Sequence, residues 1–208
     1  MMIGQRQKFT VPYDQFSEHD EQTLTELVNK VSRGMFCEIG CWVGHSTSII
    51  AKRAKELGTR VIVIDTFEGS EGTSLTDYAK ENNVEKLFRD NMEELGFNEG
   101  IGTVILYKDD SSNAHKYIGE FLSFLFIDGS HKYEDVKNDI LNYKDKILPG
   151  GIIAGHDYES DTYDELHINE DYVNGKHHGV IKAVNEVCGT VEYNRKSLSN
   201  GRIWWKQL

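Results

Sequence analysis

The chain alternates between unbroken apolar runs and stretches in which apolar residues recur at helical spacing. The apolar runs predict strands over residues 35–39, 60–65, 103–107, 122–128 and 152–157. The periodic stretches predict helices over residues 17–32, 46–57, 83–95, 113–119, 133–147 and 180–187. Continuous apolar strands are typical of a parallel sheet that is buried on both faces, so this alternation predicts an α/β fold.

Two further strands are predicted over residues 190–193 and 203–205, and the turn signal between them favours an antiparallel hairpin. The whole pattern predicts a Rossmann-like fold: a mostly parallel seven-stranded sheet with an antiparallel edge hairpin and helices on both faces. Residues 66–82 are polar, and we interpret them as a loop with one helical turn. Residues 158–176 have no clear period, which predicts a long lid loop over the site.

No repeat, linker or low-complexity tract divides the 208 residues. We therefore expect a single domain over residues 1–208, in which residues 1–32 form a helical extension. No apolar run approaches the roughly 18 residues of a membrane span, and the first residues lack the apolar segment of a signal peptide. The chain has three cysteines, Cys37, Cys41 and Cys188. An odd number without the spacing of a disulfide framework favours buried free thiols. These features predict a cytoplasmic protein.

Acidic residues stand at the ends of five successive predicted strands. They are Glu38, Asp65, Asp109, Asp128 and Asp157. A single acid at a strand end is usually a helix cap, but five together are hard to explain by packing alone. Ligands of open α/β sheets bind beyond the carboxyl ends of the strands, so the acids predict a binding site there.

The most informative motif follows the first predicted strand, where Gly40 and Gly44 frame a turn and Ser46-Thr47 open a helix. Glycine backbone at a helix N-terminus offers amide donors and room for a nucleotide-like ligand. Asp65 ends the next strand, where a carboxylate can accept both ribose hydroxyl protons. The combination predicts a cofactor that carries a ribose.

NAD is one candidate for that cofactor. The dinucleotide fingerprint needs a middle glycine that admits a pyrophosphate, and here the bulky Trp42 occupies that place between Gly40 and Gly44. S-adenosylmethionine has no phosphate to clash with an indole. The residues of this turn therefore favour S-adenosylmethionine over NAD.

The segment Glu38-Ile39-Gly40, with Gly44 and Ser46-Thr47, resembles motif I of class I S-adenosylmethionine-dependent methyltransferases, and residues 63–69 resemble their second motif. Residues 126–134 and 148–158 are similar to a bacterial branch that includes macrolide-sugar O-methyltransferases and cephalosporin-hydroxylase-like proteins. The likeness extends over about residues 35–187. It implies a class I methyltransferase fold with cofactor contacts from Glu38, Gly40, Gly44, Ser46, Thr47, Asp65, Asp110, Ser111 and Asp128, the adenine lying near Asp110 and Ser111.

Methyl transfer to a hydroxyl needs an aligned acceptor and removal of its proton. Asp128 and Asp157 end neighbouring strands and can converge on one metal ion, with His156 as a third ligand. Oxygen ligands suit Mg²⁺, while an imidazole suits Mn²⁺, Fe²⁺ or Zn²⁺. In the branch that this chain resembles, positions 156 and 157 are both acids, so His156 is a departure. Asp128 and Asp157 could instead position a substrate without metal.

The same resemblance makes His131 the catalytic base, with Asp128 beside it. A capping or surface role for His131 is the alternative. Exposed loop positions are the expectation for His177, His178 and the tyrosines at 158, 163 and 172, although these residues could instead line an acceptor pocket from the lid. Overall we predict an S-adenosylmethionine-dependent O-methyltransferase that acts on a small-molecule or sugar hydroxyl, with Mg²⁺ or Mn²⁺ as candidate metals.

Two other functions stay open. Ligands of the type His131, His156 and a carboxylate would suit an iron oxygenase of the cephalosporin-hydroxylase type. A protein that binds S-adenosylmethionine without catalysis is the second alternative. The net charge of −11 and the scattered basic residues disfavour a nucleic-acid partner, and no membrane partner is expected. A homo-oligomer remains open.

Overall fold

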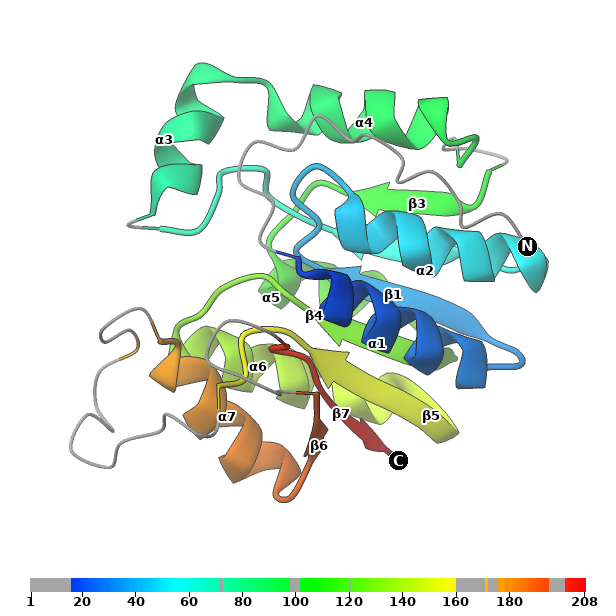
Figure 1. The fold of residues 1–208 in the computed structure, drawn as a ribbon, viewed down its shortest axis with the longest axis vertical. Helices are drawn as coiled ribbons and strands as arrows, with labels where there is room; N and C mark the ends of the chain where they lie inside the picture. Colours follow the sequence, from blue (N-terminus) through cyan, green and yellow to red (C-terminus); the bar gives the residue numbers. More distant parts are fainter. Residues whose placement is uncertain are drawn as a thin grey trace.

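The computed structural model describes residues 16–71, 73–97, 102–119, 121–159, 171, 176–194 and 201–208. Within these ranges one seven-stranded sheet has the order β3-β2-β1-β4-β5-β7-β6 (Figure 1). The parallel strands are β1 (Met35–Ile39), β2 (Val61–Ile64), β3 (Val104–Tyr107), β4 (Leu122–Ile127) and β5 (Ile147–Gly155). The predicted edge hairpin is confirmed, because β7 (Trp204–Gln207) pairs antiparallel with β5 and with β6 (Glu192–Tyr193).

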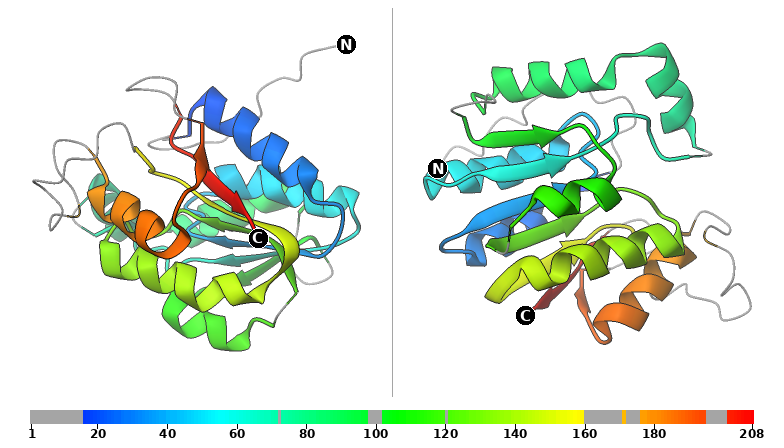
Figure 2. Two further views of the ribbon diagram at one scale, coloured as in Figure 1. Left: turned by 90° about the horizontal axis from the view of Figure 1, so that it is seen from below. Right: turned by 180° about the vertical axis from the view of Figure 1, so that it is seen from behind.

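Helices cover both faces of the sheet, as Figure 2 shows from below and from behind. One face carries α1 (Glu18–Lys30), α2 (His45–Glu56) and α4 (Val84–Glu94). The other carries α5 (Ser111–Ala114), the short turn η1 (His115–Tyr117), α6 (Tyr133–Tyr143) and α7 (His178–Cys188). Two apolar clusters fill the two layers, and strands β1, β2 and β4 are almost completely buried between them. None of the helices in the described ranges could cross a membrane.

Several predicted elements have other bounds in the structure. Residues 66–82 contain the eight-residue helix α3 (Ser74–Glu81), where a loop with only one helical turn was predicted. The short helix expected over 113–119 begins earlier, because Asp110 caps α5. The predicted helix over 133–147 ends at Tyr143 and continues as η2 (Lys144–Lys146), and β5 begins at Ile147 instead of residue 152. The turn residues 149–151 lie within β5 because Gly150 pairs with Leu208 there.

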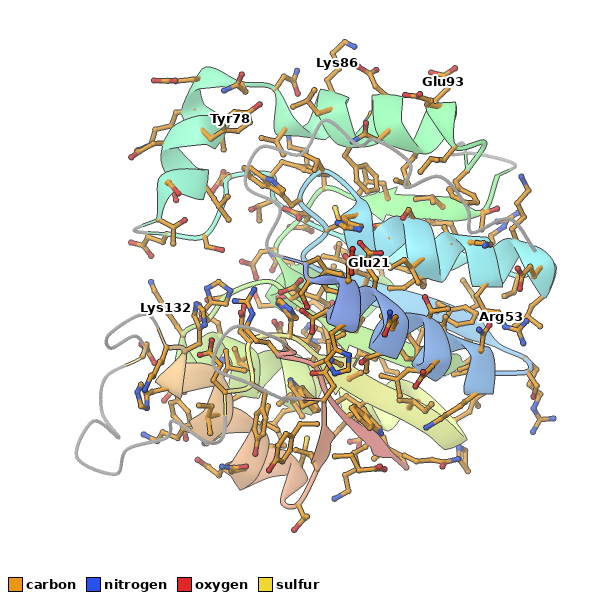
Figure 3. The ribbon with its side chains drawn as sticks, viewed as in Figure 1. Glu21, Arg53, Tyr78, Lys86, Glu93 and Lys132 are labelled. Atoms are coloured by element: carbon orange, nitrogen blue, oxygen red, sulfur yellow. The ribbon has the colours of Figure 1, made fainter. Side chains whose placement is uncertain are left out.

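Helix α1 lies beside α2 on one face of the sheet. Ser17 begins it with a capping box, in which the Ser17 hydroxyl and the Asp20 carboxylate each accept a backbone N–H. Figure 3 shows Glu21 in its first turn. The carboxylate of Glu21 lies 3.1 Å from the imidazole of His45, the first residue of α2. The N-terminal turn of α1 thus reaches the carboxyl ends of the strands.

Candidate active site

The turn after β1 depends on glycine. Gly40 has a φ of +81° and Gly44 a φ of +97°, which are left-handed values that other residues rarely adopt. A Cβ atom on Gly40 would collide with the backbone carbonyl of Asp128. Gly40 therefore lets the turn after β1 pass directly against the turn after β4, and the carboxyl ends of these two central strands meet.

Glu38 forms a buried polar cluster behind this turn. The Ser46 hydroxyl donates to one carboxyl oxygen of Glu38 at 2.5 Å, and the Thr47 hydroxyl donates to the other. Burial raises the pKa of Glu38 to about 8, although the two hydrogen bonds oppose the shift. In this arrangement the hydroxyls are committed to Glu38 and hold α2 on β1. Cofactor binding by Glu38, Ser46 and Thr47 stays a prediction.

Asp65 also supports the turn from the end of β2. One of its oxygens accepts the backbone N–H groups of Cys41 at 2.7 Å and Trp42 at 2.9 Å, and the other accepts that of Phe67 at 2.6 Å. A carboxylate has about four acceptor sites, so these bonds leave Asp65 some capacity for a ligand. Its contact with a ribose stays a prediction.

Asp110 and Ser111 lie at the carboxyl end of β3, where the adenine was expected. Asp110 caps α5 by accepting the backbone N–H of Ser112 at 2.8 Å. The Ser111 hydroxyl donates to the buried carboxyl of Asp139 at 2.5 Å. These contacts fix the start of α5, and the adenine contact of both residues stays a prediction.

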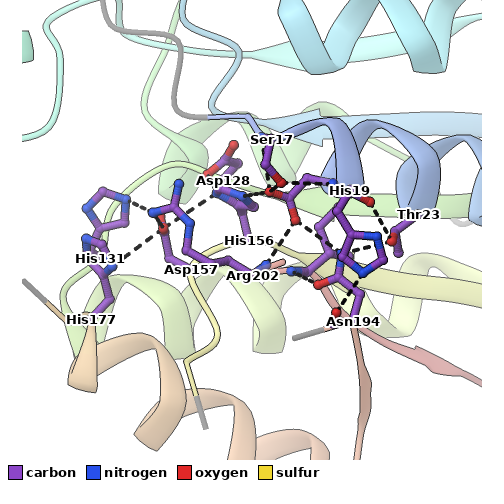
Figure 4. A network of polar contacts seen from close by, with 12 residues as sticks. Ser17, His19, Thr23, Asp128, His131, His156, Asp157, His177, Asn194 and Arg202 are labelled. Atoms are coloured by element: carbon purple, nitrogen blue, oxygen red, sulfur yellow. Dashed lines mark hydrogen bonds and ion pairs between the residues drawn. The ribbon is translucent and has the colours of Figure 1, made fainter. Parts of the chain in front are cut away.

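The three residues predicted as metal ligands come together. One ligand atom from each of Asp128, His156 and Asp157 lies within 4.8 Å of the other two. Alternation along a strand would send His156 and Asp157 to opposite faces. However, β5 ends at Gly155, and Asp157 has a φ of +58°, so the backbone turns and both side chains face inward. The Nδ1 atom of His156 lies 3.5 Å from an oxygen of each aspartate (Figure 4).

Two residues without a sequence signal complete this cluster. Arg202 donates from Nη1 to Asp157 Oδ1 at 2.7 Å. Asp20, in the first turn of α1, places an oxygen 3.6 Å from His156 Nε2 and accepts the backbone N–H of Arg202 at 2.9 Å. Burial alone would raise the pKa of both carboxyls. The neighbouring imidazoles have the larger combined effect and lower the pKa of Asp20 and of Asp157. The buried acids therefore stay ionised.

His131 faces the same aspartate from the loop after β4. Its Nε2 atom lies 2.8 Å from Asp157 Oδ2. Burial is the largest single effect and lowers the pKa of His131, but the charge and hydrogen bond of Asp157 together with the charge of Asp128 outweigh it, so the pKa is raised above the usual 6.5. The carboxylate of Asp157 thus orients the imidazole of His131, as is typical of a catalytic base. The role of His131 as the base stays a prediction.

The histidines expected on an exposed loop are buried instead. His177 and His178 are 9% and 2% exposed, because His178 begins α7 and the helix packs on α6. The ring of His177 lies 4.3 Å from that of His131, between centroids. Tyr158 is also buried, and its hydroxyl donates to Asn185 Oδ1 at 2.7 Å. Tyr163, Tyr172 and most of the expected lid loop lie outside the described residues.

Both halves of the site open into one cleft, which contains about 620 Å³ of empty space, including open solvent. Its walls come from the turn after β1, the start of α3 and the histidine–aspartate cluster. The lining residues are Phe16, Gly40, Cys41, Trp42, Val43, His45, Ser46, Ser70, Leu75, Asp128, His131, His156 and Asp157. Phe16 was not predicted as a site residue, and its ring centroid lies 5.1 Å from that of His156.

The donor atoms suit a divalent metal. With bonds of about 2.1 Å, neighbouring ligand atoms lie roughly 3.0 to 3.4 Å apart, which is near the 3.5 Å between His156 Nδ1 and the aspartate oxygens. His156 Nε2 is buried and has no hydrogen bond among the described residues. It faces Asp20, and metal-bound imidazoles commonly direct their other nitrogen at a carboxylate in this way.

Comparison with known proteins identifies the family of the chain. Residues 37–158, more than half of the chain, match a family model described as a methyltransferase domain. The matched segment begins within β1 and ends just beyond β5, so it contains the glycine turn, Asp65, Asp128, His131 and Asp157. No curated protein matches the chain in sequence.

Solved structures share the fold. The O-methyltransferase NovP is 18% identical with a TM-score of 0.64, over 91% of this chain and 79% of NovP. An O-methyltransferase from Bacillus cereus in complex with SAH is 18% identical with a TM-score of 0.61, over 91% and 80%. CalS11, a TDP-rhamnose 3'-O-methyltransferase of calicheamicin biosynthesis, is 15% identical with a TM-score of 0.57, over 92% and 81%. At these identities the likeness shows the fold.

Proposed function

Because this chain belongs to the methyltransferase domain family, we propose that it transfers a methyl group from S-adenosylmethionine to a hydroxyl oxygen of a small molecule or sugar. The observation that carries the proposal is the single cleft, in which the glycine turn and the His131–Asp157 pair face the same space. A methyl donor on the turn and an acceptor beside the pair would be within reach of each other.

The chain fits the cofactor at the turn. Gly40, Cys41, Trp42 and Ser46 of this turn all line the cleft, so a nucleoside bound there would lie against the glycine turn. When bound, S-adenosylmethionine supplies an electrophilic methyl group on a sulfonium. The residues of the chain hold the donor and the acceptor in line and exclude water, with Phe16 and Leu75 as apolar walls.

The proton of the acceptor hydroxyl passes to His131. With Nε2 directed at Asp157, Nδ1 is the ring nitrogen that takes the proton. The carboxylate of Asp157 stabilises the imidazolium that results, and Arg202 holds this carboxylate in place from its other oxygen. The O–H bond of the acceptor would break as its oxygen takes the methyl group, and the positive charge that the donor loses would then reside on the imidazolium of His131.

We further propose metal assistance. Asp128, His156 and Asp157 would hold a divalent ion, which lowers the pKa of an acceptor hydroxyl. Arg202 already contacts Asp157, so the ion would share this carboxylate with a fixed cation. The imidazole of His156 favours Mn²⁺ over Mg²⁺ at this set.

The oxygenase alternative loses its predicted ligand set. Among the described residues, His131 and His156 do not belong to one group of candidate metal ligands; His131 groups with Asp157 and His177 instead. The family match also favours methyl transfer over oxygenation. The similar structures named as sugar and other O-methyltransferases support oxygen as the acceptor atom.

The test combines binding and turnover. Calorimetry with S-adenosylhomocysteine should give equal affinity for the parent and His131→Ala, while methyl transfer to a panel of sugar and phenol hydroxyls should slow about 10²- to 10⁴-fold in the variant. His115→Ala, which removes a histidine from η1, is the matched control and should retain the rate. Methylation that occurs only on nitrogen or sulfur acceptors would contradict the proposed reaction, and an unchanged rate in His131→Ala would contradict the assignment of the base.

A further inference from the structure

A second group of potential metal ligands lies beside the first. One nitrogen from each of His131 and His177 and one oxygen of Asp157 lie within 4.8 Å of one another. In Figure 4 the two histidines lie on one side of Asp157, and Asp128 and His156 lie on the other. We propose that His131, His177 and Asp157 form a binding site for a zinc-type transition metal, with Glu159 as a further ligand.

The distances lie near those of tetrahedral coordination, with Asp157 facing His131 through one oxygen and His177 through the other. Zinc bonds of about 2.0 to 2.1 Å place the ligand atoms of a tetrahedron roughly 3.3 to 3.4 Å apart. His177 Nδ1 lies 3.5 Å from Asp157 Oδ1 and 3.5 Å from Glu159 Oε2, too long for a good hydrogen bond but close to such an edge. His131 Nε2 lies 2.8 Å from Asp157 Oδ2, and binding would widen this contact by about half an ångström.

The donor types distinguish this group from the Asp128 group. Two imidazoles and a carboxylate are a frequent zinc set, whereas two carboxylates and one imidazole in the Asp128 group suit harder ions. The two groups share Asp157. A soft ion should therefore choose the His131 side and a hard ion the Asp128 side.

The surroundings are those of a supported site. Arg202 fixes Asp157 through Oδ1, and the backbone N–H of His177 donates to Glu159 Oε2 at 3.0 Å, so both carboxylates are oriented. Asp157 and His177 are buried, while His131 lines the cleft. The cleft gives an ion an entry path to otherwise buried ligands.

Metal binding here has a consequence for the reaction. It would occupy His131 Nε2 and remove Asp157 as the partner of the base. Zinc should then inhibit methyl transfer. The existence of the site does not depend on the proposed function, but this inhibition does, because it uses His131 as the base.

Calorimetric titration of the metal-free protein with Zn²⁺ tests the site. We expect one tight site per chain, weakened by more than about 100-fold in His177→Ala and retained in Asp128→Asn and in His115→Ala. Co²⁺ should show the intense visible absorption of tetrahedral coordination in the parent and lose it in His177→Ala. Equal zinc affinity in the parent and His177→Ala would overturn the proposal. The proposal would also fail if Asp128→Asn lost the zinc site while His177→Ala kept it.

A rate measurement separates this proposal from the previous one. Zinc should inhibit the parent, whereas His177→Ala should retain its own zinc-free rate at the same zinc concentration. Tight binding at the His177 site without inhibition would support the site and contradict His131 as the base. Inhibition that persists in His177→Ala would place the inhibiting ion elsewhere and overturn the link between this site and the reaction.

Discussion

Replacement of Glu38 by glutamine should make the protein more stable at high pH. Glu38 is completely buried, and burial raises its pKa from 4.5 to about 8. Between these two values the folded protein holds a proton on Glu38 that the unfolded chain has released. The contribution is fully favourable below pH 4.5 and is lost as the pH rises toward 8. Glutamine has a similar shape and never ionises, so the variant escapes this loss.

The size of the effect follows from the shift. One pKa unit corresponds to about 1.4 kcal/mol, so the free energy of unfolding of the parent should fall by about 1.4 kcal/mol per pH unit within this window. Relative to Glu38→Gln, the parent should lose about 3.5 kcal/mol between pH 5 and pH 8. For a chain of this size, that corresponds to roughly 7 to 14 °C in melting temperature.

Urea denaturation of both proteins at pH 5, 6, 7 and 8 measures this difference. Asp139, whose pKa burial raises to about 7, affects both proteins equally and cancels. Glu94→Gln, on the exposed end of α4, is the matched control and should not change the shape of the parent curve. A difference between Glu38→Gln and the parent that is the same at pH 5 and pH 8 would refute the reasoning, because Glu38 would then not bind a proton on folding.

Three further changes have expected outcomes. Asp65→Ala should abolish S-adenosylhomocysteine binding in calorimetry, and unchanged affinity would show that the ribose does not lie there. Gly40→Ala should lower stability by about 3 kcal/mol in urea denaturation, because its φ is positive and its Cβ meets the Asp128 carbonyl; an unaffected midpoint would mean that the turn can move. Asn194→Ala should cost about 2 to 4 kcal/mol, since its buried amide joins α1 to the β6–β7 hairpin; a loss under 1 kcal/mol would show that water replaces these bonds.

The sequence predicted the features that depend on short-range pattern. The apolar runs located the strands, and the parallel order made the ends of β4 and β5 neighbours, so Asp128 and Asp157 could be paired in advance. Helix α3 was missed because it is short and Leu75, Tyr78 and Ala79 are its only apolar residues, none of which is buried. The start of β5 was missed because Pro149, Gly150 and Gly151 are typical of a turn. In the structure Gly150 and Gly151 pair with Leu208, just beyond β7.

The residues missed at the site come from distant segments. Asp20 looks like an ordinary helix cap, and Arg202 precedes a strand without any local motif. His177 was predicted to be a solvated loop residue because it stands just before α7. The apolar pattern that predicts this helix begins only at Val180. Their approach to Asp157 and His156 depends on tertiary packing between the sheet edge, α1 and α7, which no local spacing encodes.

The place of β7 between β5 and β6 sets an order for biosynthesis. Arg202 emerges from the ribosome after every other residue of the cluster, yet it holds Asp157, and its backbone holds Asp20. A nascent chain that ends at α7 contains all the parallel strands. In it, Asp157 lacks the guanidinium of Arg202, and Asp20 lacks the backbone N–H of the same residue. The histidine–aspartate cluster is therefore complete only once Arg202 has joined it, after all the parallel strands have been synthesised.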